Sequence, residues 1–382
     1  MGYGFASKCL YGDAGDDEGG CDCSGAVVFP IYQSATFTHP ELGRSTGYDY
    51  SRAQNPTREH LENIVSTLEN GAGAVAMASG MAAIAAVMEL FHMGDHIITD
   101  IDLYGGSIRL FDEIGVKNGL TFTHIDCSQD DVDSCITEQT KAIYIESPTN
   151  PMTHIVDIRK MAETAHQHKL LLIVDNTFLS PYFQKPIELG ADLVIHSATK
   201  YLAGHNDTLA GIVVASTKEL SEKLHMIEMT TGGVLSPFDS FLVTRGIQTL
   251  PVRMERAQEN AKILVSWLEN CKSVTRVFYP GIKESRGYEI SEKQTSGFGA
   301  MISFEVDRKE RVPELLERVR LIHFAESLGG VETLITYPIR QTHASVPQKI
   351  LEKTGLTDRI LRLSVGIEDI QDLLNEFERI FA

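Results

Sequence analysis

Four short apolar runs in the middle of the chain constrain its fold more than any other feature. They span residues 142–146, 170–174, 193–195 and 211–215. None of them alternates apolar with polar residues, as a strand with one solvated face would, so we expect strands that are buried on both faces. A segment of helical periodicity at 158–168 separates the first two runs. Strands that alternate with helices predict an α/β fold with a mostly parallel central sheet flanked by helices.

Polar residues follow these runs at the points where the strands would end. Asp175 follows the second run, and Lys200 follows the third run across a turn that contains Ser197 and Thr199. Open α/β sheets bind their ligands at this edge. A lysine removed from water there has a lowered pKa, which favours an imine with a carbonyl compound. The two hydroxyls could hold a phosphate; the alternative is a purely structural lysine at a strand end.

Further features upstream fit the same kind of ligand. Gly80 and Met81 begin an alanine-rich helix, where backbone amides and the helix dipole favour a phosphate; close packing of small residues is the alternative. Tyr104 lies in a glycine-bordered loop and could stack on a flat ring. Asp175, at the end of a buried strand, needs a cationic partner, which a pyridinium nitrogen would supply. With Lys200, these features predict a site for pyridoxal phosphate.

Composition excludes several classes of function. The 382 residues carry a formal net charge of −18, which argues against non-specific binding of nucleic acid and against anchoring on an anionic membrane. The first residues lack the apolar core of a signal peptide, and no apolar run reaches the length of a membrane span. Six scattered cysteines predict reduced thiols in a cytoplasmic enzyme. Cys21 and Cys23 raise a metal site as the alternative, but no second ligand pair at zinc-site spacing accompanies them, and we predict no metal ligands.

The character of the sequence changes twice, which predicts three parts. Residues 1–48 are loop-like and broken by proline, and we expect an extended N-terminal arm that docks onto a neighbouring domain or subunit. Residues 49–249 contain the alternating strands and helices of a large domain. Residues 250–382 combine a long amphipathic helix with strands of mixed exposure, and predict a smaller C-terminal α+β domain. Tyr50 and Arg52, just after the arm, point the same way if the chain is extended; a surface pair is the alternative.

Motifs over nearly the whole chain, in colinear order, resemble the trans-sulfuration (Cys/Met metabolism) family of fold-type I pyridoxal-phosphate enzymes. The most specific motif is His196-Ser-Ala-Thr-Lys200-Tyr. The others are Tyr50-Ser-Arg52, Asn55-Pro-Thr57-Arg58, Ser79-Gly80-Met81, Asp102-Leu-Tyr104-Gly-Gly, Glu146-Ser-Pro-Thr-Asn150-Pro, Val174-Asp175-Asn-Thr, Glu326-Ser327-Leu-Gly-Gly, Thr342-His343 and Leu361-Arg362-Leu-Ser-Val-Gly366. In motif, the chain is most similar to cystathionine γ-synthases and O-acetylhomoserine thiol-lyases.

This resemblance implies a role for each candidate residue. The catalytic pair would be Lys200, which binds the cofactor and moves protons, and Tyr104, which stacks on the ring; Asp175 would bind the ring nitrogen. The phosphate would be held by Gly80, Met81, Ser197 and Thr199 of one subunit and by Tyr50 and Arg52 of its neighbour. The amino-acid substrate would contact Asn150, Glu326, Ser327 and Arg362, with the last on its α-carboxylate. The family also implies a homotetramer built from two active-site dimers.

The resemblance implies an activity in cysteine and methionine metabolism. We expect γ-replacement on an O-acylhomoserine by cysteine or another thiol, giving cystathionine or homocysteine. The alternative within the family is a lyase that cleaves cystathionine or homocysteine by γ- or β-elimination, and the alternative outside it is a cofactor-binding protein without turnover. Gly106 stands where methionine γ-lyases carry a cysteine, which argues against that activity. Glu326 is a residue seen in members that handle cystathionine.

Overall fold

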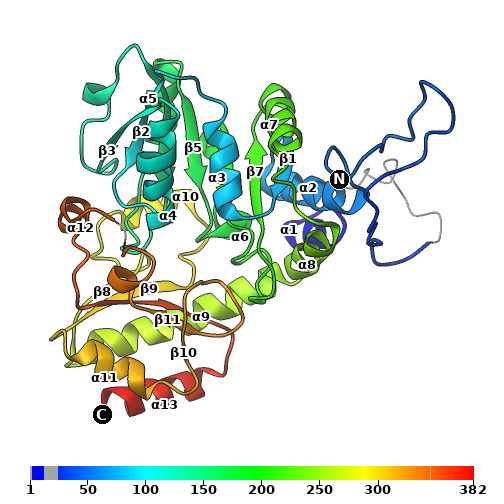
Figure 1. The fold of residues 1–382 in the computed structure, drawn as a ribbon. Coiled ribbons are helices and arrows are strands. Elements are labelled where there is room, and N and C mark those ends of the chain that lie inside the picture. Colours follow the sequence, from blue (N-terminus) through cyan, green and yellow to red (C-terminus); the bar gives the residue numbers. More distant parts are fainter. Residues whose placement is uncertain (1, 13–24, 345) are drawn as a thin grey trace.

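A seven-stranded sheet with strand order β1-β7-β6-β5-β4-β2-β3 forms the centre of the molecule (Figure 1). The computed structural model describes residues 2–12, 25–344 and 346–382. Strand β7 is antiparallel to both its neighbours, and the pairs from β6 to β3 are all parallel. The strands are β1 Gly73–Met77, β2 His96–Asp100, β3 Thr121–Ile125, β4 Thr140–Glu146, β5 Leu171–Asp175, β6 Leu193–His196 and β7 Gly211–Ala215. The prediction of an α/β fold with a mostly parallel central sheet is confirmed.

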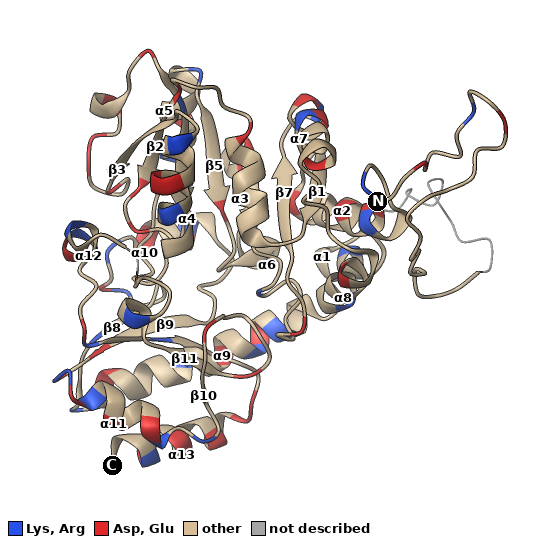
Figure 2. Cartoon of the chain, in the orientation of Figure 1, with Lys and Arg blue, Asp and Glu red and all other residues tan. Residues whose placement is uncertain are grey.

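Helices cover both faces of this sheet, which is why its strands lack polar alternation. Successive residues of β6, Val194 and Ile195, belong to two different clusters of the core, because their side chains point to opposite faces. The strand ribbons are almost free of charged residues, which lie on the helices and loops (Figure 2). The helices are α2 Pro56–Glu69, α3 Gly80–Met88, α4 Gly105–Arg109, α5 Ile158–Gln167, α6 Ser180–Phe183, α7 Lys218–Thr231 and α8 Pro237–Ile247.

A smaller five-stranded sheet, with order β10-β11-β12-β9-β8, lies in the C-terminal part. Its strands are β8 Val274–Phe278, β9 Met301–Val306, β10 His323–Phe324, β11 Leu334–Thr336 and β12 Ile360–Ser364. The helices of this part are α9 Leu250–Asn270, α10 Tyr288–Gln294, α11 Arg311–Arg318, α12 Gln348–Thr354 and α13 Ile370–Phe381. Helix α9 runs from the large sheet to beneath the smaller one (Figure 1). The domain boundary that we expect between residues 249 and 250 falls at the start of α9 and stays a prediction.

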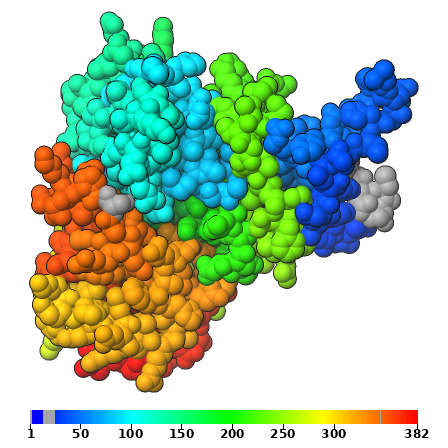
Figure 3. All heavy atoms as spheres, viewed as in Figure 1, coloured from blue at the N-terminus to red at the C-terminus, as the bar shows by residue number. Residues whose placement is uncertain are grey.

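The N-terminal part is only partly the extended arm that the sequence predicts. Helix α1, Phe5–Tyr11, corrects that expectation. Its Cys9 is fully buried in the core cluster that also contains residues of α2, so tertiary packing stabilises a helix too short to form alone. The segment 25–48 contains no helix or extended strand and stands off the body of the molecule in the space-filling view (Figure 3). Cys21 and Cys23 lie outside the described residues.

Helix α2 begins at Pro56, directly after the capping residue Asn55. The side chain of Asn55 accepts a hydrogen bond from Thr57 N at 3.0 Å, and Pro56 occupies the first turn, where its missing N–H costs nothing. Helix α4 starts at Gly105 and is followed by a π-helical turn over Leu110–Gly115. Within the part of the chain that the structure describes, no helix is both long and apolar enough to cross a membrane.

Candidate active site

A cavity of about 320 Å³ lies at the carboxyl edge of the large sheet, against the C-terminal part. Eleven of the thirteen predicted site residues line it: Gly80, Met81, Tyr104, Asn150, Asp175, Ser197, Thr199, Lys200, Glu326, Ser327 and Arg362. These residues come from distant parts of the chain, and they meet because parallel strands end at the same edge of a sheet. The structure therefore brings the predicted residues into one pocket, while their individual roles stay predictions.

The N-terminus of α3 forms one wall of this pocket. Ser79 caps the helix by accepting a hydrogen bond from Ala82 N at 3.1 Å. A Cβ atom added to Gly80 would lie 2.8 Å from Ser197 Oγ, so glycine is what allows the helix start to approach the turn after β6. Backbone amides at a helix start, beside the hydroxyls of Ser197 and Thr199, form a cup suited to a phosphate.

Lys200 follows the turn after β6 and is largely withdrawn from water. Its Nζ donates a hydrogen bond to Ser327 Oγ at 2.9 Å. Burial, together with the nearby positive charge of Arg362, lowers the pKa of Lys200 from 10.5 to about 8, although Glu326 acts in the opposite direction. A substantial fraction of the amine is therefore neutral near pH 7 to 8, which is the form that attacks a carbonyl or accepts a proton.

The backbone after Lys200 is held by a buried arginine of α9. Arg253 donates from Nη1 to Tyr201 O at 2.8 Å and from Nη2 to Gly246 O at 2.8 Å. A longer contact of 3.4 Å joins Nη2 to Leu202 O. Planar guanidinium donors that bind carbonyls on several segments fix their relative positions. The loop that carries the lysine is thus attached to the helix that carries the C-terminal sheet.

Two carboxyl groups lie side by side at the ends of β4 and β5. Glu146 and Asp175 are partners in the strand register, and both are buried. Burial and the neighbouring Asp175 raise the pKa of Glu146 well above its usual value. Burial also raises the pKa of Asp175, against hydrogen bonds from Thr177. Among the described residues, no lysine or arginine forms an ion pair with Asp175, so a bound cation is what this carboxylate lacks.

Tyr104 is positioned by the first of these carboxyl groups, that of Glu146. Its backbone N donates to Glu146 Oε2 at 3.0 Å. A Cβ atom at Gly106 would lie 2.4 Å from Tyr104 Cε1 and 3.0 Å from Met81 Sδ. A side chain at position 106 therefore requires the aromatic ring to move. The glycine leaves the ring beside Met81 in the wall of the pocket.

Arg362 is the largest fully buried side chain among those described. Its Nη1 donates to Asn150 Oδ1 at 2.8 Å and its Nη2 to Ser327 O at 2.9 Å. Its Nε has no hydrogen-bond partner, and burial lowers the pKa of the guanidinium to about 10. The Nε of Arg362 is thus a buried donor without a partner, while hydrogen bonds from Nη1 and Nη2 fix the rest of the guanidinium. Such a donor is suited to an anionic group such as a carboxylate.

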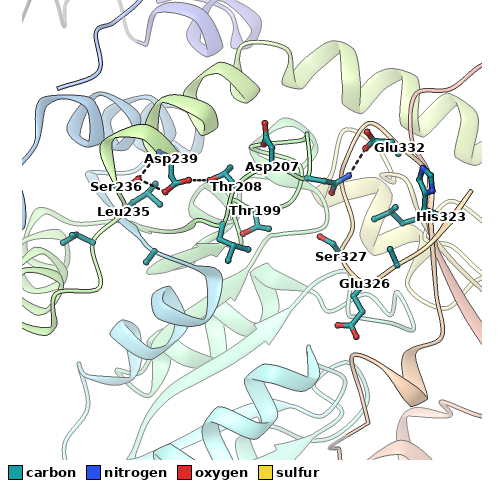
Figure 4. Close-up of a pocket in the computed structure, with 16 residues that line it drawn as sticks. Thr199, Asp207, Thr208, Leu235, Ser236, Asp239, His323, Glu326, Ser327 and Glu332 are labelled. Atoms are coloured by element: carbon teal, nitrogen blue, oxygen red, sulfur yellow. Dashed lines mark hydrogen bonds between the residues drawn. The ribbon is translucent and has the colours of Figure 1, made fainter. Parts of the chain in front are cut away.

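A larger cavity, of about 940 Å³ (Figure 4), adjoins the first and shares four lining residues with it: Thr199, Leu209, Glu326 and Ser327. We call it the vestibule. Its described lining contains four carboxylates and no lysine or arginine; they are Asp207, Asp239, Glu326 and Glu332. Asp239 is occupied by hydrogen bonds from Thr208 and Ser236, and Glu332 accepts one from Asn206. The side chain of Glu326 points away from Glu332 (Figure 4), and its charge acts on Lys200 and Arg362.

Several residues of the two cavities were missed by sequence reasoning. Glu146 was part of a motif but received no role, and only its register opposite Asp175 reveals its place. The sequence contains a signal that could have identified Asp207 as a cavity residue, because Asp207 directly follows the Lys200 loop. Asp239 had none, since it reaches the vestibule from the first turn of α8. The two predicted residues absent from the cofactor-sized pocket are Tyr50 and Arg52.

The donor set of the smaller pocket fits pyridoxal phosphate. The cup at α3 offers amides and hydroxyls for the phosphate, Asp175 lacks a cation, and Lys200 offers a partly neutral amine. These three groups correspond to the phosphate, the ring nitrogen and the aldehyde of that molecule. Each of these three groups of the pocket therefore has a counterpart in pyridoxal phosphate.

Comparison with known proteins agrees with this fit. Residues 14–382 match the model of the family described as "Cys/Met metabolism PLP-dependent enzyme". The chain is 49% identical to a cystathionine gamma-lyase of Bacillus subtilis, with 94% of each chain covered. It is 45% identical to a cystathionine beta-lyase of Lactococcus lactis, with 97% of each covered. It is 46% identical to a cystathionine gamma-synthase/O-acetylhomoserine (thiol)-lyase of Bacillus subtilis, covering 94% and 92%. Among solved structures, a cystathionine gamma-lyase from Lactobacillus plantarum complexed with L-serine is similar, with a TM-score of 0.95, 43% identity and coverage of 99% and 98%.

Proposed function

Because the chain belongs to the family of Cys/Met metabolism PLP-dependent enzymes, we propose that it catalyses γ-replacement on an O-acylhomoserine by cysteine or another thiol. Ser327 provides the observation that carries this proposal. Its hydroxyl accepts a hydrogen bond from Lys200 Nζ, and its carbonyl accepts one from Arg362. Ser327 thus contacts both Lys200, which can move a proton, and Arg362, which can bind an α-carboxylate.

Each residue then has a defined task. Pyridoxal phosphate, when bound, supplies an electron sink for carbanion chemistry. Lys200 would attach the cofactor and, as a neutral amine, would accept a proton from the substrate Cα; once it has released that proton, it could accept another from Cβ. Arg362, held by Asn150, binds the substrate carboxylate through its free Nε. Asp175 would balance the charge of the ring nitrogen, and Tyr104 would stack on the ring.

Elimination from cystathionine is the second candidate. Two relatives named as cystathionine lyases support it. The acidic vestibule supports both candidates, because cystathionine and an incoming cysteine each carry a distal ammonium that Glu326 can pair with. The reactions share the substrate backbone and differ in whether a thiol adds or leaves.

Product analysis separates the two reactions. The purified enzyme is supplied with O-acetylhomoserine, O-succinylhomoserine, cystathionine or homocysteine, each with and without cysteine, and Lys200→Ala serves as the blank. Cystathionine formed from an O-acylhomoserine and cysteine supports replacement. Release of cysteine or homocysteine from cystathionine, with no replacement product, would select a lyase.

The arm residues Tyr50 and Arg52 complete a neighbouring site in this proposal. They do not line the pocket of their own chain, yet Tyr50 and Arg52 are exposed and lie together, with the guanidinium carbon 5.6 Å from the ring centroid. We expect them to reach the phosphate of a second subunit in an active-site dimer, two of which form a homotetramer. The cytoplasmic location stays a prediction from the scattered cysteines.

A further inference from the structure

A buried ionic cluster lies behind the arm residues and is formed by Arg58, Glu62 and Glu228. Arg58 is 2% exposed, Glu62 6% and Glu228 0%. Arg58 Nε lies 3.3 Å from Glu228 Oε1 and 3.6 Å from Glu62 Oε1. Glu62 Oε1 also accepts a hydrogen bond from Ala76 N at 2.8 Å. The cluster joins the first two turns of α2 to the last turn of α7.

A contribution to the stability of the folded protein does not account well for this cluster, because its buried charges have incomplete partners. Two carboxylates share one guanidinium, and neither oxygen of Glu228 has a hydrogen-bond partner. Burial and the charge of Glu228 raise the pKa of Glu62 far above its usual range, and the ring of His225 is the other titratable group in contact, 3.4 Å from Glu228 Oε2. Buried ionic groups with incomplete partners are less stable than apolar packing of the same volume.

The guanidinium end of Arg58 binds the backbone on both sides of Arg52. Its Nη1 donates to Ser51 O at 2.8 Å and its Nη2 to Ala53 O at 3.2 Å. The same turn of α7 contacts Arg52 itself, whose Nη1 donates to Met229 O at 2.5 Å. Arg58 and Arg52 are therefore fixed by adjacent residues of one helix. The segment that carries Tyr50 and Arg52 has its backbone anchored inward, while the two side chains remain at the surface.

We propose that Arg58, Glu62 and Glu228 form a positioning device that presents Tyr50 and Arg52 to the phosphate bound in a neighbouring subunit. This inference rests on the proposed inter-subunit site. Arg58 acts through Arg52 and touches neither cofactor nor substrate. The fork of a guanidinium is needed because it must bind two carbonyls while it faces two carboxylates, and a lysine at this position has no such geometry.

The test measures the affinity of the apoenzyme for pyridoxal phosphate, by titration at the absorbance of the lysine-bound cofactor. Arg58→Lys keeps the charge and loses the fork, and Glu228→Gln keeps the shape and loses the charge. We expect each to weaken cofactor binding about three- to thirty-fold, as loss of one or two charged hydrogen bonds would. Glu222→Gln is the matched control, because Glu222 lies on the same helix in an exposed pair with Lys218, and it should leave the affinity unchanged. Arg52→Ala is measured in parallel.

Mixed oligomers decide where the defect lies. In a dimer of one Arg58→Lys and one Lys200→Ala subunit, only the first can bind the cofactor to lysine, and its site receives an intact arm from the second. Wild-type affinity in these mixed dimers supports the inference. If Arg52→Ala is rescued in this way and Arg58→Lys is not, Arg58 supports only its own subunit and the inference is wrong. An unaffected affinity in both Arg58→Lys and Glu228→Gln overturns it as well. If Arg52→Ala has no effect or is not rescued, the inter-subunit site itself is wrong.

Discussion

The lowered pKa of Lys200 predicts an unusual pH dependence for loading of the apoenzyme with its cofactor. An amine reacts with an aldehyde only in its neutral form, so the loading rate follows the neutral fraction. With the pKa at about 8 instead of 10.5, about a tenth of Lys200 is neutral at pH 7. An exposed lysine would be neutral to about three parts in ten thousand, so the structure predicts a roughly 300-fold faster reaction.

The dependence of the loading rate on pH tests the lowered pKa of Lys200 more directly than the rate at one pH does. The neutral fraction rises with pH and saturates above the pKa, so the loading rate should rise about tenfold per pH unit below about 7 and level off above about 8.5. Mixing apoenzyme with excess pyridoxal phosphate in a stopped-flow spectrometer measures it. Because Glu326 raises the pKa of Lys200, Glu326→Gln should move the whole curve to lower pH. A rate that keeps rising through about pH 10 would show that Lys200 is as hydrated as a surface lysine, and our account of its burial would be refuted.

Three other predictions use different parts of the structure. Inactive Arg52→Ala and inactive Lys200→Ala subunits should recover some activity when mixed, since one site of the mixed dimer is intact; absence of recovery in dimers shown to be mixed would contradict the shared site. Glu326→Ala should lower kcat/KM with cysteine about two- to five-fold relative to kcat/KM with sulfide, the range for an exposed charge pair, because any effect through the pKa of Lys200 is common to both nucleophiles; equal losses for both would show that Glu326 does not bind the ammonium of cysteine. Gly106→Ala should displace Tyr104 and alter the absorbance spectrum of the bound cofactor, because a Cβ there lies 2.4 Å from the ring; an unaltered spectrum would show that the ring tolerates the change.

The sequence predicts the position of a site residue correctly where a local pattern of residues determines that position. Buried strands reveal themselves by unbroken apolar runs, and polar residues at their ends must meet at one edge of a parallel sheet. The sequence therefore predicts that Asp175 and Lys200 lie in one pocket, as the structure shows. The same logic located Gly80, since a cap followed by small residues signals a helix start that a ligand can approach.

The features that escaped prediction depend on contacts between distant segments. Helix α1 forms because Cys9 is buried against the core, and its own seven residues carry no helix signal strong enough to stand alone. The role of Glu146 follows from strand register, which a single strand does not encode. Arg58 and Glu228 are separated by 170 positions, so only the three-dimensional structure reveals that their side chains face each other.

The hydrogen bond from Arg253 to the carbonyl of Tyr201 connects helix α9 mechanically to the loop that carries Lys200. The helix spans 21 residues, which corresponds to a rod of about 30 Å. Its far end packs under the smaller sheet, and its near end grips the loop of the reactive lysine. A small displacement of α9 as a whole would therefore be passed through Arg253 to the loop that carries Lys200. Substitutions at the distant end of the rod should then tune the chemistry of Lys200 without touching the pocket, and the spectrum of the bound cofactor would register their effect.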